Sequence, residues 1–109
     1  MNRLDGLWSR AIVVRDNGTC QKCYKQSENP HHVFYRTKLG SRWLLENGIN
    51  LCDDCHVHWA HAKPEEFMKW WIEKVGEEMY LYAKEMSLEI KPDLDEVELT
   101  LKEGIIKVK

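Results

Sequence analysis

Four cysteines in two close pairs constrain this chain more than any other feature. Cys20 and Cys23 form one pair, Cys52 and Cys55 form the other, and 28 residues separate the pairs. Two residues between cysteines allow a tight turn to point both sulfurs at one ion, and two such turns complete a tetrahedral site of four thiolates. The sequence therefore predicts a structural Zn²⁺ bound by these four residues.

Two other uses of paired cysteines fit the sequence less well. Two disulfides in an exported miniprotein would come with a secretion signal and a higher density of cysteine. The first ten residues, MNRLDGLWSR, interrupt their apolar stretch with Asp5 and Arg10. A redox dithiol needs only one such pair on a βαβ frame. We therefore expect a cytoplasmic protein with a zinc site.

The length of 109 residues is short for two independent cores. We expect one domain over residues 1–75 and a helical extension over residues 76–109 packed on it, with a tail at 104–109 that could be disordered. The apolar runs are too short to cross a membrane, so no membrane partner is expected.

The net charge of −2 conceals an asymmetry along the chain. Residues 1–42 carry eight Lys and Arg against three Asp and Glu, whereas residues 43–109 carry eight against fifteen. If a phosphate-bearing partner binds, the basic first part is where it would lie. Ordinary solvated surface explains the same asymmetry about equally well.

The apolar pattern predicts an α+β fold that is mainly α. Helices are expected over residues 4–15, from the second cysteine pair onward, and over residues 64–75, 77–88 and 93–103. Residues 31–35 are aromatic and β-branched, as in a strand, and a second short extended segment is expected between residues 42 and 51. The aromatic stripes of the later helices are interpreted as packing.

Three histidines lie beside these elements in positions that suit chemistry. His31 and His32 are neighbours on the first predicted strand, where successive side chains point to opposite faces. One can therefore bind a metal while the other faces a water molecule. His56 directly follows Cys55, so the turn that fixes the zinc ligands also fixes this imidazole.

With these residues in place, the sequence resembles the HNH nucleases, also called ββα-metal or His-Me finger nucleases, and especially compact phage-type members with a four-cysteine zinc. The similarity covers roughly residues 7–72. The motifs that carry it are Cys20-x-x-Cys23, His31-His32, the segment NGINLCDDCH from Asn47 to His56, and Trp59-Ala60-His61. The resemblance implies a ββα-metal finger with an N-terminal helix and C-terminal helices, and a metal-dependent endonuclease that cuts DNA.

The family's roles transfer by position to four residues. The resemblance implies that His32 is the general base, that His31 and His56 bind the catalytic ion, and that Asn47 orients the loop and the base. A histidine titrates near neutrality, so neutral His32 can accept a proton from an attacking water. The asparagine amide can tie the loop backbone and could also bond to the imidazole.

The identity of the catalytic ion depends on His31, because many relatives have Asp at this position. Imidazoles are softer ligands than a carboxylate, so we expect Mn²⁺ or Ni²⁺ to support activity at least as well as Mg²⁺. His61 is a candidate further ligand, although a surface or supporting role is the favoured interpretation. The family's extra histidine lies one turn after the last ligand, where this chain has Ala60.

DNA is the expected partner, and three basic residues are candidates for its phosphates. Arg36, Lys38 and Arg42 flank the loop between the predicted strands, where a guanidinium could grip a phosphate in bidentate fashion. The sequence contains nothing that resembles a base-reading helix, so weak sequence preference is expected.

Two alternatives stay open at this stage. The chain could be a noncatalytic zinc module that binds nucleic acid or docks onto a protein, for which the histidines would not be needed together. It could also act within phage packaging or recombination machinery, with residues 77–109 as a docking surface. The sequence does not decide between nicking and double-strand cleavage, or between monomer and dimer.

Overall fold

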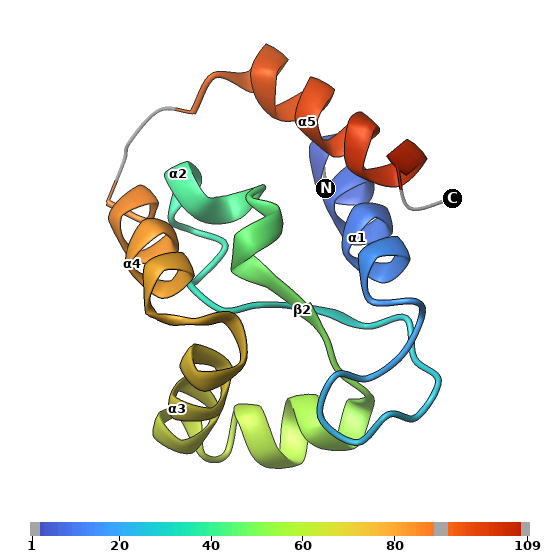
Figure 1. Ribbon diagram of the computed structural model, residues 1–109, viewed down its shortest axis with the longest axis vertical. Coiled ribbons are helices and arrows are strands. Elements are labelled where there is room, and N and C mark those ends of the chain that lie inside the picture. The colour runs from blue at the N-terminus through green and yellow to red at the C-terminus, as the bar shows by residue number, and fades with distance from the viewer. Residues whose placement is uncertain (1–2, 89–91, 108–109) are drawn as a thin grey trace.

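The computed structural model describes residues 3–88 and 92–107. It is a mainly helical α+β fold with a small antiparallel sheet, which confirms the predicted class. The elements, shown in Figure 1, are α1 (Arg3–Arg15), β1 (Pro30–His32), α2 (Leu39–Arg42), the 3₁₀ helix η1 (Leu45–Asn47), β2 (Gly48–Asn50), the π-helix η2 (Asp54–Ala60), α3 (Pro64–Val75), α4 (Glu77–Met86) and α5 (Leu94–Lys107). Within the described ranges, no helix has the length and apolar character that crossing a membrane requires.

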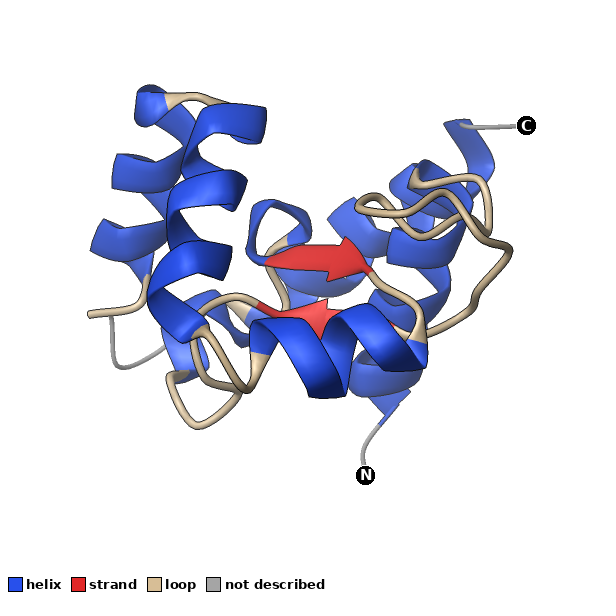
Figure 2. Ribbon diagram, turned by 90° about the horizontal axis from the view of Figure 1, so that it is seen from below, coloured by secondary structure: helices blue, strands red, loops and turns tan. Residues whose placement is uncertain are grey.

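The sheet consists of β1 and β2 and lies between the helices (Figure 2). Its register pairs Pro30 with Asn50, His31 with Ile49 and His32 with Gly48. The first strand is shorter than predicted, because the chain bends at Val33 and Phe34 and both of their amides bond to Asn47.

Two groups of buried side chains lie on either side of this sheet. The first group, which we call the thiol-side core, contains Cys20, Ile49, Leu51, Cys52, Ala60, Phe67, Trp71 and Ala83. The second group, the α1-side core, contains Leu4, Trp8, Ala11, Ile12, Trp43 and Leu101. A helix with apolar residues on one face must bury that face, and α1 buries its apolar face against α5 (Figure 1).

The prediction for the C-terminal tail was wrong in part. Residues 104–107 continue α5 instead of forming a disordered tail, whereas residues 108–109 lie outside the described part of the chain. The helix continues because Leu101 is fully buried and Ile105 packs on the α1-side core. Gly104 is accommodated in the helix by close packing, since a Cβ there would lie 3.2 Å from Cδ1 of Leu45.

Candidate functional site

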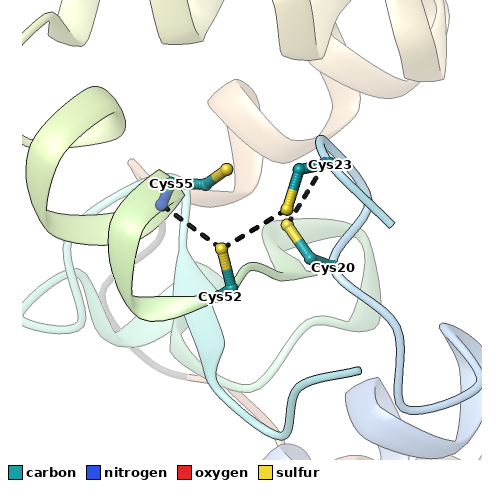
Figure 3. A group of neighbouring side chains, drawn as sticks. All are labelled: Cys20, Cys23, Cys52 and Cys55. Carbon is teal, nitrogen blue, oxygen red and sulfur yellow. Dashed lines mark hydrogen bonds between the residues drawn. The ribbon is translucent and has the colours of Figure 1, made fainter. Parts of the chain in front are cut away.

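The four cysteines meet at one point, as the sequence predicted. Their sulfur atoms all lie within 4.8 Å of one another and no disulfide joins them. Cys20 and Cys23 come from the loop after α1, whereas Cys52 lies just before η2 and Cys55 in its first turn (Figure 3). In each pair the amide of the second cysteine lies 3.5 Å from the sulfur of the first, Cys20 or Cys52. This cluster can bind a structural metal ion.

The electrostatics of the cysteine cluster also suit a cation. Burial of Cys20 opposes its ionisation, but backbone amides that point at its sulfur outweigh this effect and lower its pKa to about 6. Burial and the neighbouring sulfurs raise the pKa of Cys55 far above its usual value. Four thiolates this close repel one another, so a bound divalent cation is what would keep all of them ionised.

A second donor cluster is formed by imidazoles. One ring nitrogen from each of His31, His56 and His61 lies within 4.8 Å of the others. The ring centroids of His56 and His61 are 4.5 Å apart, and those of His31 and His56 are 4.6 Å apart. Three imidazoles that converge in this way can bind a divalent transition-metal ion.

The π-helical geometry of η2 explains why His61 joins this cluster. The amide of His61 donates to the carbonyl of His56, five residues earlier, at 3.0 Å. In an α-helix residues four apart share a face, and widening to a π-helix transfers this relation to residues five apart. Ala60, at the position where the family pattern would put a further ligand, is instead buried.

Two imidazoles of this cluster, those of His31 and His56, are held in their neutral form. Burial, with repulsion from His56 and His61, lowers the pKa of His31 to about 3. Burial and His61 also lower the pKa of His56. A neutral imidazole has a free lone pair, which is the form that binds metal.

His32 points to the opposite face of β1, as the strand alternation predicted. Its ring stacks on the indole of Trp8, with centroids 3.9 Å apart and planes 9° from parallel. Its Nε2 lies 2.9 Å from the carbonyl oxygen of Arg42. A carbonyl can only accept, so Nε2 carries the proton and Nδ1 of the neutral ring has the lone pair. Burial lowers the pKa of His32, so it is a neutral base at pH 7.

Asn47 is fully buried and organises the loop between β1 and α2. Its Oδ1 accepts from the amide of Phe34 at 2.6 Å, and its Nδ2 donates to the carbonyls of Phe34 and Ser41. The expected loop-ordering contacts are therefore present. The imidazole of His32, by contrast, is held by the Arg42 carbonyl and by Trp8.

The basic residues expected to contact DNA differ in how exposed they are and in whether they already pair with a carboxylate. The guanidinium of Arg42 is engaged in a bidentate pair with the buried carboxylate of Asp5, at 2.9 and 2.6 Å. Arg42 therefore has a structural contact in addition to its predicted one, and its contact with a DNA phosphate stays a prediction. Arg36 lies 3.5 Å from Asp5 but its side chain remains 55% exposed, and Lys38 is exposed.

A cleft of about 810 Å³ joins these groups. His31, His32, His56 and His61 all line it, as do Arg36 and Lys38. His32 and the imidazole cluster thus line one space, although their side chains lie on opposite faces of β1. Among the residues that the structure describes, no cysteine lines this cleft.

Comparisons with family models, with curated proteins and with solved structures found no match. The functional interpretation therefore depends on the residues of the site. Sequence reasoning missed Asp5 and Trp8, which lie in a helix whose apolar pattern indicated only packing. The sequence indicates His61 only as a candidate further ligand, because its spacing of five residues from His56 puts the two side chains on one face in a π-helix and not in an α-helix.

Proposed function

We propose that this protein is a metal-dependent endonuclease of the HNH type that hydrolyses phosphodiester bonds in DNA. The observation that carries the proposal is the separation of two donor sets. Four cysteines form one cluster and three imidazoles another, and His32, a neutral imidazole, lines the cleft beside them. A module that needed only a structural zinc would have no use for the second cluster.

In this proposal the cysteines bind a structural Zn²⁺, and the order β1, β2, η2 forms a ββα-metal finger. The zinc ties the loop after α1 to the start of η2 and so fixes His56, which follows Cys55. A second divalent ion would be held by His31, His56 and His61. When bound, it would act as a Lewis acid toward the phosphate oxygens.

His32 would perform the proton transfer. Nδ1 removes a proton from a water molecule as the water oxygen attacks phosphorus and the bond from phosphorus to the leaving oxygen breaks. Nε2 keeps its hydrogen bond to the Arg42 carbonyl throughout, so the ring does not rotate. The imidazolium that forms lies against the face of the Trp8 ring, where a cation is favoured. Arg36 and Lys38 are positioned to bind flanking phosphates.

The proposal is tested by plasmid nicking with His32→Ala and with His58→Ala as a matched control. His58 is exposed and is not part of the imidazole cluster. We expect His32→Ala to reduce nicking by at least about a hundredfold while the protein stays folded at the assay temperature, and His58→Ala to cut normally. We also expect Mn²⁺ or Ni²⁺ to support cutting at least as well as Mg²⁺. Wild-type nicking by His32→Ala would exclude the proposed base.

Metal binding gives a second, independent measurement. Isothermal titration of the zinc-loaded protein with Mn²⁺ or Ni²⁺ should reveal one further site, and His61→Ala should weaken it by at least about tenfold. A protein that binds DNA but neither binds the second ion nor nicks plasmid would instead be a noncatalytic zinc module.

A further inference from the structure

The cleft beside the imidazoles has walls that a phosphate does not require. Away from the histidines, it is lined by Val33, Phe34, Pro64, Phe67 and Met68. These side chains offer no hydrogen-bond donor to an anion. An apolar cavity of this size, with a few polar groups at one end, is typical of a site for a flat organic group.

Tyr35 lines this cleft, and its side chain is not part of either buried core. Its side chain is 78% exposed, and it lines the cleft together with Arg36 and Lys38. The backbone of the loop is held by other contacts, since Asn47 binds Phe34 and the amide of Lys38 donates to the carbonyl of Tyr35. The conformation of the loop therefore does not depend on the phenol ring.

Aromatic rings next to cationic side chains are the elements that bind unpaired nucleotides. A base stacks on the ring face, and the cations hold the phosphates on either side. Here Tyr35 supplies the exposed ring, Arg36 and Lys38 supply the charges, and the apolar walls supply a place that excludes water. In a duplex each base is stacked and paired, so it cannot enter such a space without being extruded.

We propose that this cleft binds an unstacked nucleobase of the strand whose phosphate lies at the imidazoles, with Tyr35 stacking on that base. This inference rests on the proposed nuclease function and names its substrate class. DNA with an unpaired nucleotide, such as a single strand or a bulge, is the preferred substrate. Fully paired duplex is disfavoured because the base must first leave the helix.

The test is equilibrium binding of zinc-loaded protein to oligonucleotides that carry 2-aminopurine, without added Mg²⁺, Mn²⁺ or Ni²⁺. Three forms are compared, a single strand, a duplex with one bulged 2-aminopurine and a perfect duplex. We expect the bulged and single-stranded forms to bind about tenfold more tightly than the duplex. The fluorescence of the unpaired base should be quenched on binding, as expected when it stacks on an aromatic ring.

Three variants make the assignment specific. Tyr35→Ala should remove most of the preference and the quenching, whereas Tyr35→Phe should retain both because it keeps the ring. Tyr24→Ala is the matched control, since Tyr24 is also largely exposed, at 73%, but does not line the cleft. Equal binding of duplex and bulge by the wild-type protein, or an unchanged preference in Tyr35→Ala, would overturn the inference.

Failure of this inference and failure of the proposed function give different results. If the protein nicks plasmid but treats paired and unpaired bases alike, the nuclease proposal stands and the base-binding cleft is wrong. If it binds unpaired bases through Tyr35 but cuts nothing with any divalent ion, the cleft stands and the nuclease proposal is wrong.

Discussion

Replacing Gly48 by alanine should destabilise the protein and disturb its proposed base. Gly48 is the partner of His32 in the sheet and lies beneath α1. A Cβ at this position would lie 2.5 Å from Cζ2 of Trp8, and 2.6 and 2.8 Å from Cδ1 and Cγ1 of Ile12. Both neighbours are almost completely buried, so neither can swing into solvent.

The magnitude follows from the overpacking of a well-packed core. Forcing an additional methyl group into such a site costs about 1–3 kcal/mol. A domain of this size loses about 4 °C of melting temperature per kcal/mol, so we expect a decrease of about 4–12 °C. The indole of Trp8 must move, and the ring of His32 that stacks on it moves with it. DNA nicking should therefore fall more than the folded fraction does.

Gly6→Ala is the matched control, because it is the same chemical change in an exposed position of α1. In the part of the chain that the structure describes, a Cβ at Gly6 would have no neighbouring atom within 4 Å beyond the backbone of its own helix and the adjacent residues. Alanine is the better helix former, so this variant should gain about 0.5–1 kcal/mol.

The assay is thermal unfolding followed by circular dichroism at fixed zinc concentration, because bound metal shifts the apparent stability. Opposite signs for the two variants are the expected result. If Gly48→Ala melted at or above the wild-type temperature, the close contact beneath Trp8 would be wrong, and so would its role in supporting His32.

Two further perturbations test other parts of the fold. Asp5→Ala removes the carboxylate that binds Arg42 and the indole of Trp43, and should lower the free energy of unfolding by about 3 kcal/mol because it leaves a mostly buried cation unpaired. In urea unfolding, the exposed Arg3→Ala control should show no measurable change in this free energy. An equal loss of stability in the two variants would contradict the importance of burial. Removal of the bound metal by a chelator, or Cys52→Ser, should abolish the cooperative thermal transition, and an unchanged transition without metal would exclude a structural role for the cysteine cluster.

Local chemistry allowed much of the fold to be predicted. The C-x-x-C spacing allowed the cluster of four cysteines to be predicted, because a turn with two residues between the cysteines has few conformations. The helices at residues 3–15, 64–75 and 77–86 followed from their apolar periodicity and from Pro64 and Gly76 at their ends. The opposite orientation of His31 and His32 followed from strand geometry alone.

The remaining features depend on contacts between distant residues. The pairing of Arg42 with Asp5 spans 37 residues, and no local pattern indicates it. The helical continuation through Gly104 depends on packing against α1 and Leu45, whereas local composition favoured a disordered tail. In the π-helix η2 the backbone hydrogen bonds join residues five apart instead of four apart. The apolar residues of this short segment do not indicate which of the two helical periods it adopts.

Because β1 lies between two cores, the cysteine and histidine motifs alone do not fix the orientation of His31 and His32. His31 contacts the ring of Phe67, in the thiol-side core, edge-on at 5.1 Å between centroids. His32, the next residue, stacks on Trp8, in the α1-side core. A strand sends consecutive side chains to opposite faces, so each core orients one of the two histidines. A domain trimmed to the cysteine and histidine motifs, without α1, would retain the cysteine and imidazole clusters but lose the surface on which His32 packs. The relative placement of His32 and of the imidazole cluster therefore depends on the packing of both cores against one three-residue strand.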